Sequence, residues 1–157
     1  MRRWLAVAGA VLFVGCTSGR ANEIGRVRSG DTEFVVELTN GFARTSLKKG
    51  GESSLVVGLT STADVDFMRK MIDTGMASTE TPAEGAEVMV SKMNTGRPEA
   101  RIVVATTGGK KAFRLVYSNR ADAAPAPLFS FELTPQTLAG VEALLDKTRE
   151  RFAAPAR

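Results

Sequence analysis

The stretch TEFVVELTNGFARTSLKKG, residues 32–50, decides the fold of this chain. Apolar residues alternate with other residues up to Asn40-Gly41, a dipeptide that favours a tight hairpin turn because both central positions require positive φ. Pairing outward from the turn places Leu38 opposite Ala43, Val36 opposite Thr45 and Phe34 opposite Leu47. The same register sets Glu37 opposite Arg44 on the other face. One apolar face and one charged face predict a half-buried antiparallel sheet.

Alternating patterns predict further strands on the C-terminal side of this hairpin. These strands are expected at 53–59, 87–93, 101–106, 111–118 and 128–133. Gly108-Gly109 is expected to form a second tight turn, which pairs Val104 with Phe113, Ile102 with Leu115 and Ala100 with Tyr117. The opposite face of this pair, Val103 with Arg114 and Arg101 with Val116, is mixed, so we expect it to be wet or only partly covered.

Two segments change to a helical period. Residues 61–75 carry apolar residues at helical spacing, acidic residues in the first turn and a glycine at the end. In residues 134–152, Thr134 is the expected N-cap, and Pro135 takes the first helical position. An apolar stripe predicts that this second helix packs across a sheet. The stripe consists of Leu138, Val141, Leu144, Leu145, Thr148 and Phe152.

The fold class follows from the order of these elements. Three strands, a helix, four strands and a helix make an α+β fold in which two antiparallel runs are each followed by a helix, βββα-ββββα. We expect one such domain over residues 31–152 and a disordered tail over 153–157. Residues 16–30 are polar and contain several glycines, so they are expected to form a flexible tether.

The N-terminus has the pattern of an export signal. Arg2 and Arg3 precede an apolar run that ends at Gly15, and Cys16, the only cysteine of the chain, follows directly. A spanning helix needs about 20 apolar residues, so this run is too short to cross a bilayer. The sequence Phe13-Val14-Gly15-Cys16 resembles the lipobox of bacterial lipoproteins.

This resemblance implies a processed and lipid-anchored protein. Residues 1–15 would be removed as a signal peptide, and Cys16 would carry acyl chains that hold the protein at a membrane. Thr17 in place of an aspartate is similar to lipoproteins sorted to the outer membrane of Gram-negative bacteria. The expected location is therefore the bacterial cell envelope, on the outer membrane and facing the periplasm.

Composition removes several kinds of chemistry. The chain has no histidine, and its one cysteine is unavailable when acylated, so histidine bases, cysteine nucleophiles and zinc–thiolate sites are excluded. Removing residues 1–15 takes away two of the 21 basic residues and none of the 17 acidic ones, which leaves a net charge of about +2. This small charge disfavours nucleic acid as a partner unless a local patch exists.

Three short motifs have a possible chemical interpretation. Ser46 and Lys49 have the serine-x-x-lysine spacing, but its companion motifs are absent. The stretch 108–111, Gly-Gly-Lys-Lys, lacks the glycine and the hydroxyl residue of a phosphate-binding loop. Asp64 and Asp66 are two carboxylates that suit a helix start better than a metal. We therefore assign no catalytic residue, metal or cofactor.

Basic residues gather in the two predicted hairpins. The first set is Arg44, Lys48 and Lys49, and the second is Arg97, Arg101, Lys110, Lys111 and Arg114. The element order is similar to that of Whirly-type and Pur-type single-stranded nucleic-acid binders, although no motif accompanies the similarity. Such binders stack bases on exposed aromatic rings, whereas Phe34, Phe113, Phe129 and Phe131 share the parity of the core.

Three functions follow, in order of preference. The first is a lipid-anchored envelope protein whose domain binds or scaffolds without catalysis, with an envelope protein or polysaccharide as partner. The second is a polyanion or single-stranded nucleic-acid binder that uses a basic sheet face. The third is a histidine-free hydrolase that depends on Asp64.

Overall fold

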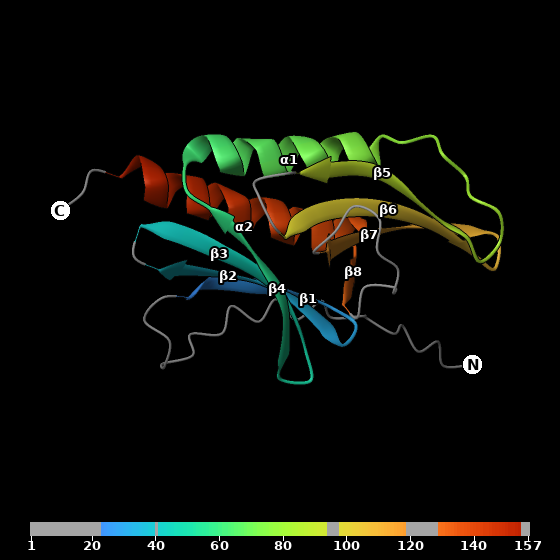
Figure 1. Ribbon diagram of the computed structural model, residues 1–157, viewed down its shortest axis with the longest axis horizontal. Helices are drawn as coiled ribbons and strands as arrows, with labels where there is room; N and C mark the ends of the chain where they lie inside the picture. Colours follow the sequence, from blue (N-terminus) through green and yellow to red (C-terminus); the bar gives the residue numbers. More distant parts are fainter. Residues whose placement is uncertain (1–22, 40, 94–97, 119–128, 155–157) are drawn as a thin grey trace, which may run out of the picture.

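The computed structural model describes residues 23–39, 41–93, 98–118 and 129–154, which form two antiparallel four-stranded sheets and two helices (Figure 1). The first sheet contains β1 (Glu23–Ser29), β2 (Thr32–Thr39), β3 (Phe42–Lys49) and β4 (Glu52–Leu59). The second contains β5 (Glu87–Met93), β6 (Glu99–Thr107), β7 (Lys110–Ser118) and β8 (Ser130–Glu132). The helices are α1 (Thr62–Met76) after the first sheet and α2 (Pro135–Ala153) after the second.

This architecture confirms the α+β fold with a helix after each run of strands. Each sheet is a simple meander, in the orders β1-β2-β3-β4 and β5-β6-β7-β8. The registers of both predicted hairpins are also confirmed, including Phe34 opposite Leu47 and Ile102 opposite Leu115. Alternation and turn chemistry sufficed here because both hairpins close through short turns that fix the pairing.

The prediction of a flexible tether over residues 16–30 is wrong for its second half. Residues 23–29 form β1, which pairs along its length with β2, so the first run has four strands and the domain begins at Glu23 and not at residue 31. A bulge between Glu23 and Gly25 breaks the alternation, and Gly25 takes an inward position where Leu144 leaves no room for a side chain. Because of this bulge and this glycine, the sequence of β1 lacks the regular alternation of a strand and has the composition of a linker.

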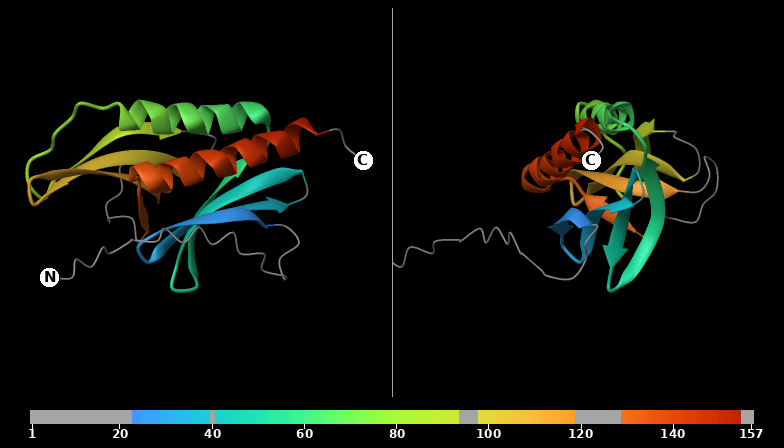
Figure 2. Two further views of the ribbon diagram at one scale, coloured as in Figure 1. Left: turned by 180° about the vertical axis from the view of Figure 1, so that it is seen from behind. Right: turned by 90° about the vertical axis from the view of Figure 1, so that its left-hand side faces the viewer.

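Each helix covers the sheet of the other half. The first helix packs on β5 and β6, whereas α2 packs chiefly on β1, and the two helices contact one another (Figures 1 and 2). Glycines allow these close approaches: a Cβ on Gly75 of α1 would lie 2.7 Å from Ile102, and one on Gly140 of α2 would lie 2.9 Å from Val27. The predicted packing of α2 on a sheet is confirmed, and its main partner is the strand missed in the sequence.

The core lies between the two sheets and beneath the helices. Phe34 and Phe131 are fully buried, with ring centroids 6.1 Å apart, and so join β2 to β8. The buried hydroxyl of Tyr117 on β7 donates a hydrogen bond of 2.8 Å to Thr45 Oγ1 on β3. Thr45 in turn donates to the carbonyl of Val57 at 3.0 Å. Apolar contact and a polar chain thus connect the sheets.

The outer face of β6 and β7 is partly covered at its arginines, as predicted, but it is more buried at its valines. Val103 and Val116 were expected on a wet or partly covered surface, yet they are 9% and 3% exposed. Arg114, which lies opposite Val103, forms an ion pair of 2.7 Å with Glu87 across the intervening strand. A charged pair spanning three strands and buried valines therefore share this face.

The helix termini follow the sequence closely. Ser61 caps α1 by accepting a hydrogen bond from the backbone of Asp64, and Thr134 and Thr137 form a reciprocal capping box on α2 with Pro135 inside the first turn. The helix α2 ends at Ala153, one residue into the predicted tail. The predicted signal peptide (1–15), Cys16, the rest of the tether (17–22) and the tail residues 155–157 lie outside the described residues.

The molecule has two distinct ends along its long axis. The start of β1, the end of β2 and the C-terminal end of α2 lie at one end, and the turn between β6 and β7 lies at the other (Figures 1 and 2). We call these the near end and the far end.

Candidate functional site

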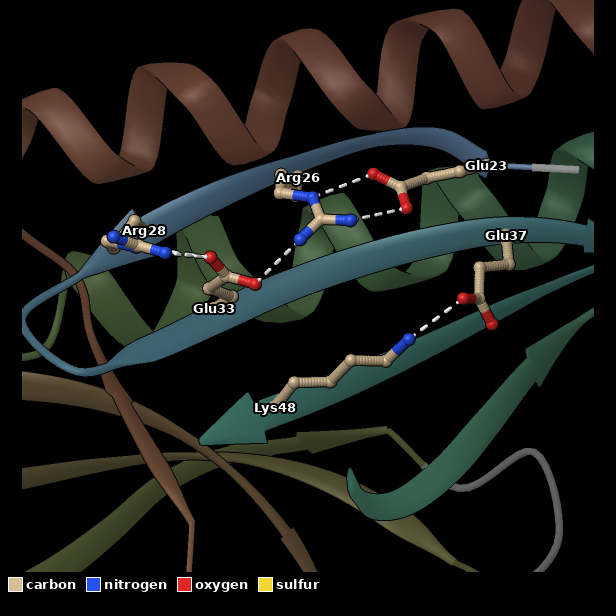
Figure 3. A network of polar contacts seen from close by, with 6 residues as sticks. All are labelled: Glu23, Arg26, Arg28, Glu33, Glu37 and Lys48. Atoms are coloured by element: carbon tan, nitrogen blue, oxygen red, sulfur yellow. Dashed lines mark hydrogen bonds and ion pairs between the residues drawn. The ribbon is translucent and has the colours of Figure 1, made fainter. Parts of the chain in front are cut away.

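A network of charged side chains lies on the face of the first sheet opposite the core, which we call the charged face (Figure 3). Strand parity places its residues on the side away from Phe34 and Leu47, because successive side chains point to opposite faces. The charged face consists of Glu23, Arg26, Arg28, Glu33, Glu37, Arg44 and Lys48.

Arg26 is the centre of the network on the charged face. Its guanidinium donates two hydrogen bonds to the carboxylate of Glu23, at 2.8 and 2.7 Å, and a third to Glu33 at 3.0 Å. Arg28 donates to the other oxygen of Glu33. The hydrogen bond that Arg26 donates to Glu23 raises the pKa of the guanidinium above its ordinary value.

Glu37 lies opposite Arg44 in register, as predicted, but its ion pair is with a different residue. Its carboxylate accepts a hydrogen bond of 2.8 Å from Lys48. Lys48 lies on the same strand as Arg44, four residues further along, and is therefore diagonal to Glu37. Arg44 is exposed and makes no ion pair within the described part of the chain. A diagonal partner is within reach because the lysine side chain is long.

Four of the eight predicted basic residues are neutralised by ion pairs, Lys48 among them. Lys49 pairs with Asp31 at 2.8 Å, Arg101 with Glu99 at 2.8 Å, and Arg114 with Glu87. The Nζ of Lys111 donates to the carbonyl of Ser78 and lies over the ring of Phe113. Lys110 is exposed in the turn, and Arg97 lies outside the described residues. The two basic sets therefore do not form one continuous positive patch in the part of the chain that is described.

The four phenylalanines that share the parity of the core give no stacking surface on the sheets. Phe34 and Phe131 are fully buried, and Phe113 and Phe129 are partly buried against the core, as their parity predicted. Phe67 is 44% exposed, but it lies on α1 and not on a sheet. A mode of binding in which bases stack on strand residues thus lacks its rings among these positions.

The Gly-Gly-Lys-Lys stretch is a hairpin turn whose amides already have an anionic partner. Gly108 and Gly109 have φ of 59° and 71°, values that residues with a side chain rarely adopt. Their backbone N–H groups donate to the two carboxylate oxygens of Glu84, at 2.6 and 3.2 Å. Glu84 therefore takes the place that a phosphate would need, and it fastens the loop before β5 to this turn.

The remaining motif residues have structural partners. Ser46 is buried in the middle of β3, and Lys49 is engaged by Asp31, so the serine-x-x-lysine spacing brings no activating pair together. Asp64 accepts hydrogen bonds from the backbone and hydroxyl of Thr60, which lower the pKa of its carboxyl. Asp66 does not share this role, because it pairs with Arg149 of α2.

Two features of the sequence escaped prediction. Asp66 and Arg69 on α1 pair reciprocally with Arg149 and Asp146 on α2, so an Asp-x-x-Arg pattern occurs in both helices. Comparing the two helices for this spacing would have revealed it. Arg26 and Arg28 stood in the expected tether, where their alternation before Gly30-Asp31 was the available signal.

Metal-binding and membrane-spanning features were sought in the described residues. No three side chains of the types His, Cys, Asp and Glu lie close enough there to hold a metal ion. None of the described helices has the length and hydropathy needed to cross a bilayer.

Comparison with protein-family models, with curated proteins and with solved structures finds no match for this chain.

Proposed function

We propose that this protein is a lipid-anchored protein of the bacterial envelope whose α+β domain binds or scaffolds another envelope macromolecule without catalysis. The observation that carries the proposal is the sequence of residues 1–16. A basic start, an apolar run too short to span a bilayer and a small residue directly before the only cysteine are what lipoprotein processing requires.

The charged face supports a binding role over a catalytic one. Its carboxylates are engaged by its basic groups, as in the contacts of Arg26 with Glu23 and Glu33. General acid–base catalysis needs a group that is poised to gain or lose a proton beside a substrate. Alternating donors and acceptors instead suit the hydroxyl groups of a polysaccharide or the polar surface of a protein.

Intact-mass measurement tests the anchor. We expect the wild-type protein from membranes to have the mass of residues 16–157 plus acyl chains, and Cys16→Ser to keep residues 1–15 without lipid, because the thiol is the acylated group. An unmodified, full-length wild-type product would overturn the proposal.

Crosslinking in intact cells tests the binding role. We expect a covalent adduct with an envelope protein or polysaccharide that is lost when Arg26→Glu and Arg28→Glu disrupt the charged face. Lys70→Glu together with Lys92→Glu, an equal change of charge at exposed positions of α1 and β5, serves as the matched control. Retention of the adduct in the charged-face variant would place binding elsewhere.

A second candidate is the binding of a polyanion, such as single-stranded nucleic acid. The observation in its favour is the order of elements, now with four strands before each helix. Binding would fall steeply with added salt, because released counterions drive such association, and it would weaken in Lys110→Glu. Absence of salt-sensitive binding would leave the first proposal as the better one.

A further inference from the structure

We infer that the near end of the domain rests against the anionic phospholipid surface in which the acyl chains of Cys16 are embedded, and that the far end points away from it. This inference rests on the proposed lipid anchor. It adds a membrane-facing surface and an orientation, neither of which follows from the lipid alone.

The first step is the reach of the chain. Seven peptide units separate Cys16 from Glu23, so their Cα atoms are at most about 25 Å apart. Glu23 is a fixed point of the domain, because its strand pairs with β2 from Glu23 onward and packs under α2. A tether running to residue 30 would have reached about 50 Å and would have permitted any orientation. Because β1 belongs to the domain, the segment that connects Cys16 to the domain is shorter than the sequence predicted.

The second step is the position of Glu23 on the molecule. It lies at the near end, beside the end of β2 and on the same side as the C-terminus of α2 (Figures 1 and 2). The helix α2 has 19 residues and thus a length of about 28 Å, which it spans along the domain. Seen from Glu23, the far end therefore lies beyond α2. The short connection to Cys16 favours orientations in which the far end points away from the membrane.

The third step is the charge exposed at the near end. Arg44, Lys147 and Arg151 are all exposed there, and none makes an ion pair within the described residues. Glu23 is neutralised by Arg26, which leaves Glu150 in the last turns of α2 and Asp64 at the start of α1 as the opposing charges that make no ion pair within the described residues. Basic side chains close to an anionic leaflet are attracted by its negative surface potential. The near end thus complements an anionic phospholipid surface.

The test uses labels placed along one helix and at the far end. Once Cys16 is acylated the protein has no other thiol, so an introduced cysteine takes a fluorophore at one position. Glu150→Cys and Gln136→Cys are both exposed on α2 and about 21 Å apart along its axis, and Lys110→Cys marks the far end. Each acylated protein is added to vesicles of phosphatidylethanolamine and phosphatidylglycerol that carry nitroxide headgroups.

The expected result is a gradient of quenching. We expect several-fold stronger quenching at Glu150→Cys than at Gln136→Cys, and the weakest quenching at Lys110→Cys. Equal quenching at the three positions, or the reverse order, would overturn the inference while leaving the lipid anchor in place. Absence of acyl chains by mass would instead remove the proposed function, so the two failures are distinguishable.

A longer segment between Cys16 and Glu23 provides the matched control. Inserting six glycine and serine residues after Gly19 roughly doubles the reach without changing the domain. The gradient should then diminish at unchanged acylation. A gradient that grows with the insertion would contradict the role assigned to the short chain.

Discussion

At the scale of single residues, the most informative contact is the buried hydrogen bond between Tyr117 and Thr45. It joins the two sheets at a point where both side chains are shielded from water. Thr45 also donates to the carbonyl of Val57, so the two partners are not equivalent. Tyr117 depends on Thr45 as its acceptor, whereas Thr45 keeps an acceptor of its own.

This asymmetry predicts unequal losses of stability. Thr45→Val leaves the Tyr117 hydroxyl buried without an acceptor, which should cost about 1–3 kcal/mol of unfolding free energy. Tyr117→Phe removes the donor while Thr45 still binds Val57, which should cost about 0.5–1.5 kcal/mol. Urea denaturation measures both. A larger loss for Tyr117→Phe would show that Thr45 and not Tyr117 depends on this contact.

The same tyrosine predicts sensitivity to alkali. Burial raises the pKa of Tyr117 above its ordinary value of 10.0, so the folded state favours the neutral phenol more than the unfolded state does. Its contribution to stability is full below pH 10.0 and declines as the pH rises above that value, because only the unfolded chain then ionises readily. Urea denaturation on both sides of this pH should show a smaller alkaline loss in Tyr117→Phe than in wild type. Equal losses would contradict the assignment.

At the scale of elements, the contact between helix and sheet depends on glycine. Gly75 lies on the buried side of α1, and a Cβ there would come within 2.7 Å of the Ile102 side chain on β6. Helix propensity favours alanine over glycine by about 1 kcal/mol, so propensity and packing oppose each other at this position. Packing should decide, because the contact is with the Cβ and Cγ2 atoms next to the β6 backbone.

We therefore expect Gly75→Ala to lower the unfolding free energy by about 1–3 kcal/mol through overpacking. Gly58→Ala on β4 is the control, because a Cβ there would meet no atom within 4 Å and its φ is not in the positive region. Thermal or urea unfolding compares the two. Adding Ile102→Ala should recover part of the loss in Gly75→Ala, and additive effects of the two changes would contradict direct contact.

At the scale of the whole molecule, the helix of each half covers the sheet of the other half. Neither half can therefore bury its own sheet without the other. The first helix lies on the second sheet and α2 on the first, and Asp66 and Asp146 add reciprocal ion pairs between the helices. The first strand carries more of this arrangement than its composition indicates, because α2 packs mainly on it.

Deleting β1 should therefore abolish cooperative folding. A chain that starts at Gly30 lacks the strand that pairs with β2 and the surface on which Gly140 and Leu144 of α2 pack, whereas a chain that starts at Ala21 keeps both. Circular dichroism during thermal unfolding should show a sharp transition only for the longer chain. Equal transitions would restore the interpretation of residues 23–29 as tether.

The sequence by itself determined the local structure: the hairpin registers about Gly41 and Gly108-Gly109, the capped start of α2 and the order of strands and helices from β2 onward. These features depend on neighbours close in the chain, whose periodicity and turn residues are visible in one dimension. Only the tertiary structure decided that Gly25 belongs to a strand, that Glu84 fills the Gly108 turn, that Glu37 binds Lys48 and that each helix covers the opposite sheet. The physical reason is that the role of a glycine or a charged residue depends on which residues it contacts, and these can be up to 119 positions away, as Leu144 is from Gly25. The pattern of residues along the chain does not show which distant residues come into contact.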